Sequence, residues 1–208
     1  MIYTVPVKGV FETNCYFYID DTTGHGFLID PGAQGKALAR LIQEQGWHME
    51  KILLTHGHFD HTGGIASLRG ELSIPVMAFE NADLYLLDPY KNLSRHCGPD
   101  VNVPGAEFFH DGDLLTLQAN PDCSLRVLWT PGHTEDSVIF YSEKDGAAFV
   151  GDTIFKGSIG NFSYPGGNRE QLLRSIRETV FSLPEETTLL SGHSEPTTVG
   201  AEKQRYRW

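Results

Sequence analysis

The sequence has few cysteines and no long hydrophobic run. Its three cysteines, Cys15, Cys97 and Cys123, are odd in number and far apart, so no disulfide framework is expected and a reducing cytoplasm is favoured. No segment approaches the roughly 18 apolar residues of a membrane span. Residues 1–20 also lack the basic leader and apolar core of a signal peptide. We therefore expect a cytoplasmic protein without a membrane partner.

Basic residues are scarce as well. The chain carries 16 Lys and Arg against 27 Asp and Glu, a formal net charge of -11. A surface of this sign repels the phosphates of nucleic acid, which excludes nucleic acid as an expected partner. A small anionic substrate stays possible if bound metal reverses the charge locally. With 208 residues and 40% hydrophobic content, the chain can bury one core, so a single domain over residues 1–208 is expected.

Short strand-like and helix-like segments follow each other in two similar runs. The first run predicts strands at 3–7, 14–19, 26–30, 51–55 and 75–79, helices at 36–46, 60–70 and 80–88, and a loop at 89–104. The second predicts strands at 113–118, 124–129, 137–142, 147–152 and 187–193, with an amphipathic helix at 168–183. Each half has strands first and helices after. The pattern predicts an α/β fold, a four-layer αββα sandwich.

Polar side chains with metal-binding chemistry gather in the motif THGHFDH, residues 55–61. His56 and His58 are two apart in an extended segment, so they point to the same side, while Asp60 and His61 come where the chain turns into a helix. Three other predicted strands end, beside a glycine, in a residue of a ligand type: His133, Asp152 and His193. Strand ends hold side chains rigidly, so we expect these four loops to build one metal site.

The number of candidate ligands indicates what kind of site this is. Five histidines and two aspartates exceed the four ligands of one tetrahedral ion. Two ions that share a carboxylate accommodate all seven: His56, His58 and His133 on one ion, Asp60, His61 and His193 on the other, and Asp152 between them. Two divalent ions are therefore expected. Imidazole and carboxylate ligands fit zinc, and they leave iron and manganese open.

With these ligands in place, the sequence resembles the metallo-β-lactamase superfamily. The segments IDPG (29–32) and GDTIFKGSIG (151–160) make it similar to the short glyoxalase II-like hydrolases within that superfamily. The resemblance implies an αββα sandwich, two metal ions, and hydrolysis of small-molecule thioesters, typically S-lactoylglutathione. Two cations bring the pKa of a shared water towards neutrality. A hydroxide held between the ions would attack the carbonyl carbon, with Asp60 orienting it as well as binding metal.

The sequence departs from these relatives at several places, among them the segment GHSEPTT, where Ser194 and Glu195 stand in place of the usual GHGP. Asn161 stands where relatives carry an Arg or Lys that holds a glutathione carboxylate, and Glu135-Asp136 replaces Pro-Gly. The sequence also ends near where full-length glyoxalase II enzymes begin a helical domain that completes the glutathione site. We therefore expect weak binding of glutathione thioesters. Lys156 and the tail that contains Arg205 and Arg207 are the remaining candidates for the missing charge.

Other functional interpretations of the same pattern stay open. A persulfide dioxygenase-like oxidoreductase shares the fold and most ligands but uses one iron and oxygen, and it typically keeps an Arg at the position of Asn161. A lactonase or another ester hydrolase would use the same site, and a non-catalytic metal carrier is the third alternative. The four remaining histidines have no comparable context and are expected to be structural or exposed: His25, His48, His96 and His110.

Overall fold

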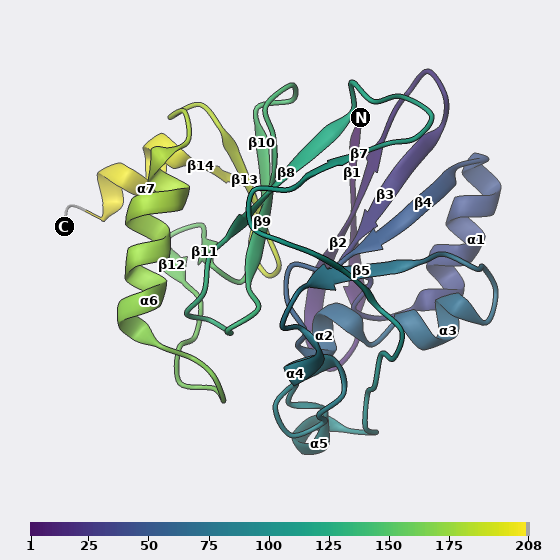
Figure 1. The fold of residues 1–208 in the computed structure, drawn as a ribbon, viewed down its shortest axis with the longest axis horizontal. Helices are drawn as coiled ribbons and strands as arrows, with labels where there is room; N and C mark the ends of the chain where they lie inside the picture. Colours follow the sequence, from purple (N-terminus) through teal and green to yellow (C-terminus); the bar gives the residue numbers. More distant parts are fainter. Residues whose placement is uncertain (207–208) are drawn as a thin grey trace.

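Two six-stranded sheets face each other in the computed structural model, which describes residues 1–206 (Figure 1). The first sheet consists, in spatial order, of β1 (Ile2–Lys8), β2 (Glu12–Ile19), β3 (His25–Ile29), β4 (His48–Leu53), β5 (Val76–Phe79) and β6 (Glu107–Phe109). The second consists of β14 (Thr197–Thr198), β13 (Thr188–Ser191), β10 (Ala147–Gly151), β9 (Val138–Ser142), β8 (Ser124–Trp129) and β7 (Leu114–Thr116). A small hairpin joins β11 (Ile154–Phe155) to β12 (Ser158–Ile159).

The direction of the strands explains where polar loops can meet. Strands β3, β4, β5 and β6 run parallel, as do β10 and β13, whereas the remaining pairs within the two large sheets are antiparallel. Parallel neighbours end at the same edge of their sheet, and ligand sites are typically built at that edge. The loops after β4, β10 and β13 are therefore available to one shared site.

The apolar side chains form three layers, as a four-layer sandwich requires. On β2, Cys15, Phe17 and Ile19 face the helices outside the first sheet, whereas Tyr16 and Tyr18 face the second sheet. This alternation follows from the two-residue period of a strand. A central cluster lies between the sheets, and a third cluster packs the second sheet against the C-terminal helices. The predicted αββα sandwich is confirmed.

The helices outside the first sheet are shorter than the sequence predicts. Helix α1 (Gly35–Gln45) agrees with the prediction at 36–46 and ends at Gly46 in the left-handed region, φ 66°. The predicted helix 60–70 is instead two pieces, α2 (Phe59–Thr62) and α3 (Ile65–Arg69). The break arises because the Gly64 N–H donates to Pro31 O at 2.9 Å, which ties the chain to the turn after β3. Of the predicted helix 80–88 only α4 (Asp83–Leu86) is helical, and the predicted loop contains α5 (Ser94–Cys97).

The helix predicted at 168–183 is present but irregular. Helix α6 (Arg169–Arg174) continues as a π-helical turn (Ser175–Thr179) and a 3₁₀ turn (Val180–Ser182). Its start is capped by Asn168, whose side chain accepts the Gln171 N–H at 3.1 Å. A last helix, α7 (Val199–Arg205), was not predicted. Within residues 1–206, none of the helices combines the length and the apolar character that crossing a membrane requires.

Candidate metal centre

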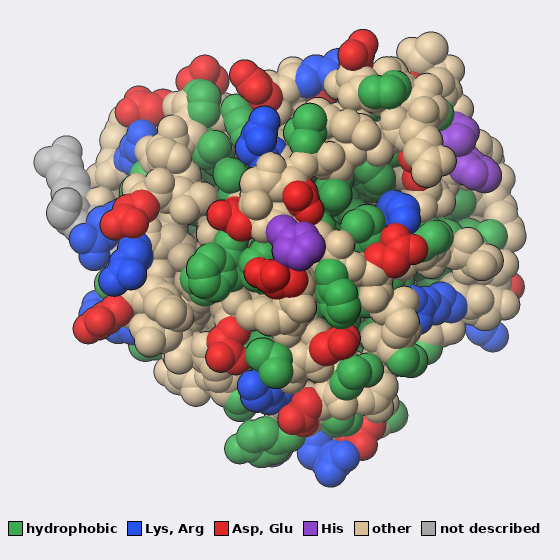
Figure 2. All heavy atoms as spheres, in the orientation of Figure 1, with side chains coloured by type: hydrophobic (Ala, Val, Ile, Leu, Met, Phe, Trp, Pro, Cys, Tyr) green, Lys and Arg blue, Asp and Glu red, His purple; other side chains and the backbone are tan. Residues whose placement is uncertain are grey.

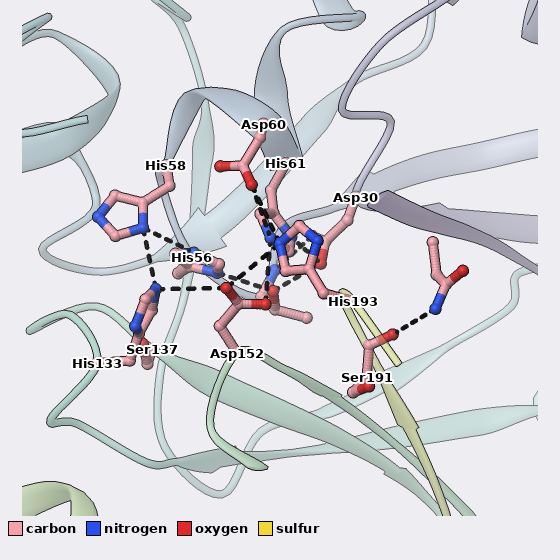
Figure 3. Close-up of polar contacts among 12 residues, drawn as sticks. Asp30, His56, His58, Asp60, His61, His133, Ser137, Asp152, Ser191 and His193 are labelled. Atoms are coloured by element: carbon pink, nitrogen blue, oxygen red, sulfur yellow. Dashed lines mark hydrogen bonds and ion pairs between the residues drawn. The ribbon is translucent and has the colours of Figure 1, made fainter. Parts of the chain in front are cut away.

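The structure brings all seven predicted ligand residues to one place, between the two sheets' edges (Figure 3). His56 and His58 follow β4, and Asp60 and His61 lie on α2. The second sheet supplies the other three residues from the loops after β8, β10 and β13: His133, Asp152 and His193. Side chains from positions more than a hundred residues apart in the sequence therefore share one cluster, in which all the histidines except His193 are buried.

The first group consists of three buried histidines. His56 Nε2 lies 3.1 Å from His58 Nδ1, and His58 Nδ1 lies 3.0 Å from His133 Nε2. Each of the three side chains is almost inaccessible to solvent. Three ring nitrogens that converge in this way have more lone pairs than protons to share. A cation between them is the arrangement that satisfies all three.

The second group lies beside the first and contains a carboxylate. His193 Nε2 lies 3.1 Å from Asp60 Oδ2, and His61 Nε2 lies 3.9 Å from the same oxygen. Asp152 stands between the two groups. Its carboxylate oxygens lie 3.6 Å from His133 Nε2, 3.4 Å from His61 Nε2 and 3.4 Å from His193 Nε2. One carboxylate therefore faces both groups, as the sequence predicts for a bridging ligand.

The far nitrogens of the histidine rings are held by hydrogen bonds. His61 Nδ1 donates to Asp30 Oδ2 at 2.9 Å, His133 Nδ1 donates to Asn161 O at 2.7 Å, and His193 Nδ1 donates to Glu12 O at 2.8 Å. Each bond places a ring proton on Nδ1 and turns Nε2 towards the cluster. Metal-binding histidines are oriented in this way by acceptors outside the site.

The same reasoning fixes the fourth ring. The Thr55 hydroxyl donates to Asp30 Oδ2 at 2.6 Å, so its oxygen accepts the proton of His56 Nδ1, 3.2 Å away. His56 Nε2 then carries the lone pair that faces the cluster. In addition, His61 Nε2 and Asp152 Oδ1 are buried and make no hydrogen bond, although they lie 3.4 Å from each other as an ion pair. Buried polar atoms of this kind are costly unless something else binds them, so the residues fit a metal site.

Burial and neighbouring charges divide the cluster into neutral and charged parts. Burial, with the nearby imidazoles, lowers the pKa of His56 and lowers the pKa of His58 to about 3. Burial also opposes the charge of Asp152, but His61 and the other histidines outweigh it and hold the Asp152 pKa well below its usual value. Burial opposes protonation of His61 and His193 as well, but Asp152 and Asp60 outweigh it: they raise the pKa of His61 well above its usual value and raise that of His193 to about 10. Divalent metal binds neutral imidazoles and ionised carboxylates, so an ion at this end of the cluster would displace a proton from each of these two rings.

One residue of the site, Asp30, was missed as a functional residue by sequence reasoning. It follows β3, adopts a φ of 50°, and accepts three hydrogen bonds: from Thr55 N at 2.8 Å, from the Thr55 hydroxyl and from His61 Nδ1. It thereby orients both His61 and, through Thr55, His56. The IDPG segment drew attention to this turn only through a family resemblance. A carboxylate directly after a buried strand was the available signal.

Two glycines allow the loops to approach closely. Gly132 has a φ of 132°, and a Cβ there would overlap the backbone of Leu172 on α6. A Cβ on Gly192 would overlap Asp152 Oδ1 and the ring of His61. The glycines beside His133 and His193 are therefore needed for these histidines to reach the cluster.

The other histidines lie apart from the cluster. In residues 1–206, the groups of side chains with metal-binding geometry contain only the seven predicted residues. His25 Nδ1 lies 2.9 Å from Glu50 Oε1, the ring of His96 packs on Tyr90, and His110 is 62% exposed. These positions agree with structural or surface roles.

The cluster forms the base of a cavity of about 220 Å³. Aromatic side chains line much of its wall: Phe11, Phe59, Phe155 and Tyr164. On the face shown in Figure 2, hydrophobic side chains surround a histidine near the centre, and acidic side chains lie beside it. An apolar wall above a polar base suits a small organic ligand.

The departure at Glu135-Asp136 places one carboxylate near the surface and one in the interior. Glu135 Oε2 accepts from the Tyr85 hydroxyl at 3.3 Å and from Lys91 Nζ at 3.4 Å. Asp136 is only 1% exposed, and burial raises the pKa of its carboxyl to about 7. The folded protein therefore favours the neutral form of the Asp136 carboxyl, and ionisation of this group lowers the stability of the fold.

The raised pKa of Asp136 predicts a pH-dependent stability. In the unfolded chain an Asp titrates near about 3.9, so the folded protein holds this proton to higher pH and loses stability as pH rises through about 7. The side chain in Asp136→Asn stays neutral at every pH. When the pH is raised from 5 to 8, the unfolding free energy of the wild type should therefore fall by about 2–3 kcal/mol more than that of the variant. Urea unfolding of both metal-free proteins at the two pH values measures this. Parallel pH dependences would show that Asp136 ionises freely in the folded state.

The fold and this cluster define a metal-dependent hydrolase. A family model described as the metallo-beta-lactamase superfamily matches residues 9–193. The chain belongs to this superfamily.

Relatives and solved structures agree with this assignment. The chain is 37% identical to a probable metallo-hydrolase, YqgX, of Bacillus subtilis, over 95% of this chain and 92% of that protein. It is 31% identical to the hydroxyacylglutathione hydrolase GloC of Haemophilus influenzae, over 96% and 93%. The BLEG-1 B3 metallo-β-lactamase superposes with a TM-score of 0.90 at 33% identity, over 98% and 97% of the two chains. A protein crystallised in a di-iron-bound form superposes with a TM-score of 0.85 at 31% identity, over 99% and 98%.

Proposed function

We propose that the protein is a thioester hydrolase of the glyoxalase II-like type that uses two metal ions. The observation that carries the proposal is the position of Asp152, whose carboxylate lies 3.6 Å from His133 and 3.4 Å from both His61 and His193. A structural ion would need only one closed set of four ligands. The hydroxyacylglutathione hydrolase among the relatives supports a thioester as the substrate. We further propose that it acts in the cytoplasm on a small molecule.

The proposal assigns each ligand a role. His56, His58 and His133 would hold one ion, Asp60, His61 and His193 the other, and Asp152 would contact both. We propose zinc for both positions, because imidazole and carboxylate are ligands that zinc accepts; iron and manganese are the alternatives. When bound, the pair of ions supplies a hydroxide at neutral pH and polarises the substrate carbonyl.

The remaining work falls to the side chains around the cluster. The Asp60 carboxylate is 11% exposed and borders the cavity, so it is placed to accept a hydrogen bond from the attacking water and to orient it. The ring of Phe59 and the ring of Tyr164 line the wall and limit access of bulk water. A thiolate is a good leaving group, so the reaction needs no strong acid from the protein.

Glutathione has few cationic partners near this site. Asn161 lines the cavity, and its side chain accepts the Ser163 N–H at 2.8 Å. Lys156 Nζ lies 2.7 Å from Glu195 Oε2, and Arg205 Nε lies 3.4 Å from Glu202 Oε2. Both candidates for the missing charge are thus paired with carboxylates. Arg207, the third candidate, lies outside the described residues. We infer that S-lactoylglutathione is hydrolysed with weak saturation.

Restoring a cation tests this inference. Asn161→Arg should lower KM for S-lactoylglutathione about tenfold, since a charge-assisted hydrogen bond to a carboxylate is worth about 1.5–3 kcal/mol before solvent screening. The rate constant kcat should change little, because the contact is made equally in the ground and transition states. A thioester of an uncharged thiol serves as the control and should show no gain. Tight saturation of the wild type, with no gain from arginine, would mean that the charge comes from elsewhere.

A further inference from the structure

A second and larger cavity adjoins the metal cavity. It has a volume of about 550 Å³ and shares Phe11, Phe59 and Asp60 with the smaller cavity at the cluster. The rings of Phe11 and Phe59 lie 6.0 Å apart, centroid to centroid, at the junction. The groove then runs between the β1–β2 loop, helices α2 and α3, and the segment 97–103, on the side where Figure 1 shows α2, α3 and α5. Its volume is that of a small-molecule site.

The lining of this groove is largely apolar. Val10, Ala66, Val101 and Val103 contribute to its walls in addition to the two phenylalanines. Val10 is 59% exposed and Phe11 is 49% exposed. Covering apolar side chains that are accessible beside a reactive centre with a hydrocarbon removes apolar surface from water, which lowers the free energy of the complex.

The charged and polar side chains of the groove are unsuited to an anion. Lysine and arginine are absent from the lining among the described residues, and its two charged residues, Asp60 and Asp100, are acidic. Asp100 already pairs with Arg95, with Arg95 Nε 2.8 Å from its Oδ1. The Thr62 hydroxyl donates to His58 O at 3.1 Å, and Gln34 Oε1 accepts the Lys8 N–H at 3.2 Å. Asn102, which is exposed, and Cys97 are the other polar side chains of the lining. A ligand with many amides or carboxylates would therefore find few partners here.

We propose that this groove binds the hydrocarbon acyl chain of a thioester whose carbonyl lies at the metal centre. The inference rests on the proposed thioester hydrolysis and names the substrate class as acyl thioesters with an apolar chain. Thiol carriers built from peptide-like units carry amides, which lose their hydrogen bonds to water in such a groove. A hydrocarbon chain loses none. The groove therefore takes the acyl side, and the carrier faces the outer mouth of the metal cavity.

The chemical step is ordinary hydrolysis and balances with water alone. The carbonyl carbon forms a bond to the oxygen of water, and the bond from that carbon to sulfur breaks. The sulfur leaves with the electron pair as a thiolate, and the protons of water end on the thiolate and in solvent. The products are a carboxylate with the apolar chain and a free thiol.

A series of substrates that differ only in acyl length tests the groove. The metal-loaded protein would be assayed with acetyl, butanoyl, hexanoyl and octanoyl thioesters of one uncharged thiol, N-acetylcysteamine. Each added methylene should raise kcat/KM about two- to fourfold, mainly through KM, because burial of a CH₂ is worth up to about 0.8 kcal/mol, or about fourfold. A flat or falling series would overturn the inference while leaving thioester hydrolysis in place.

A matched pair of variants locates the effect. Ala66 is exposed on α3 and lines the groove, whereas Ala37 is exposed on α1 and does not. Ala66→Trp should lower kcat/KM for the octanoyl thioester at least tenfold and leave the acetyl thioester nearly unchanged, and Ala37→Trp should change neither. Val10→Asp offers a second route, since a charge on this exposed loop should also penalise only the long chain. Equal behaviour of Ala66→Trp and Ala37→Trp would contradict the inference.

A binding readout separates this inference from the proposed function. Cys97 lines the groove, whereas the other two cysteines are buried and burial raises the pKa of their thiols. Octanoate should therefore slow alkylation of Cys97 by iodoacetamide severalfold, and acetate at equal concentration should not. If octanoate protects Cys97 but no thioester is turned over, the proposed hydrolysis is refuted, and the groove remains supported as a site for a hydrocarbon chain. Absence of protection together with a flat substrate series would refute the groove.

Discussion

Replacement of Asp152 by alanine is expected to abolish hydrolysis and to weaken the binding of both metal ions. The carboxylate lies within 3.6 Å of His133, His61 and His193, which belong to the two different ligand groups. Loss of one shared ligand therefore leaves each group one donor short and removes a negative charge that balances the cations. We expect kcat/KM to fall more than about a thousandfold, which corresponds to roughly 4 kcal/mol of transition-state stabilisation.

Metal content after dialysis, measured together with thioester turnover, checks this expectation. The matched control is His110→Ala, because His110 is 62% exposed, and its ring nitrogens lie 3.6 Å from Glu80 and Asp113. That variant should keep both its metal and its activity. An Asp152→Ala protein that retains two tightly bound ions would contradict the shared-ligand role.

The second large effect is expected from Asp30, which lies behind the ligands. Asp30→Asn keeps the size of the side chain but removes the charge that faces His61 Nδ1, 2.9 Å away, and the hydroxyl of Thr55. Acceptors behind metal-binding histidines typically contribute about 10- to 100-fold in metal affinity. We expect the upper end, about 100-fold, because Asp30 orients two of the rings. Competition with a chromophoric chelator measures the affinity directly.

A second buried aspartate provides the control for this substitution. Asp20 lies at the opposite end of β3 and accepts from the Thr23 hydroxyl at 2.7 Å within a turn. Asp20→Asn should change folding stability without changing metal affinity. If the two asparagine variants lost affinity equally, the effect of Asp30 would be general destabilisation and its positioning role would be wrong.

The residues of the cluster were predictable because each carries a local signal. His56, His58, Asp60 and His61 stand within six positions, and the other three follow a predicted strand with a glycine directly beside them. The order of strand-like and helix-like segments in the two halves likewise predicted the layered fold. Both signals reside in neighbouring residues, so the sequence alone displays them.

The features that were missed depend on contacts between distant segments. Asp30 acts through Thr55 and His61, which are 25 and 31 positions away. The π-helical turn after α6 contains Ser175, whose hydroxyl donates to Pro131 O at 2.7 Å, 44 positions earlier. The strands β11, β12 and β14 have two residues each, too few for a hydrophobic period to be visible. The groove beside the cluster is likewise formed by four separate segments.

The central claim is a pair of metal ions that drives hydrolysis without oxygen. Its most direct test is metal analysis of the purified protein combined with turnover of a thioester in the presence and absence of oxygen. We expect about two metal equivalents per chain, since seven ligands exceed the needs of one ion, and equal rates under both atmospheres. A single iron per chain, with oxygen consumed when glutathione persulfide is supplied, would contradict the account and identify an oxidoreductase.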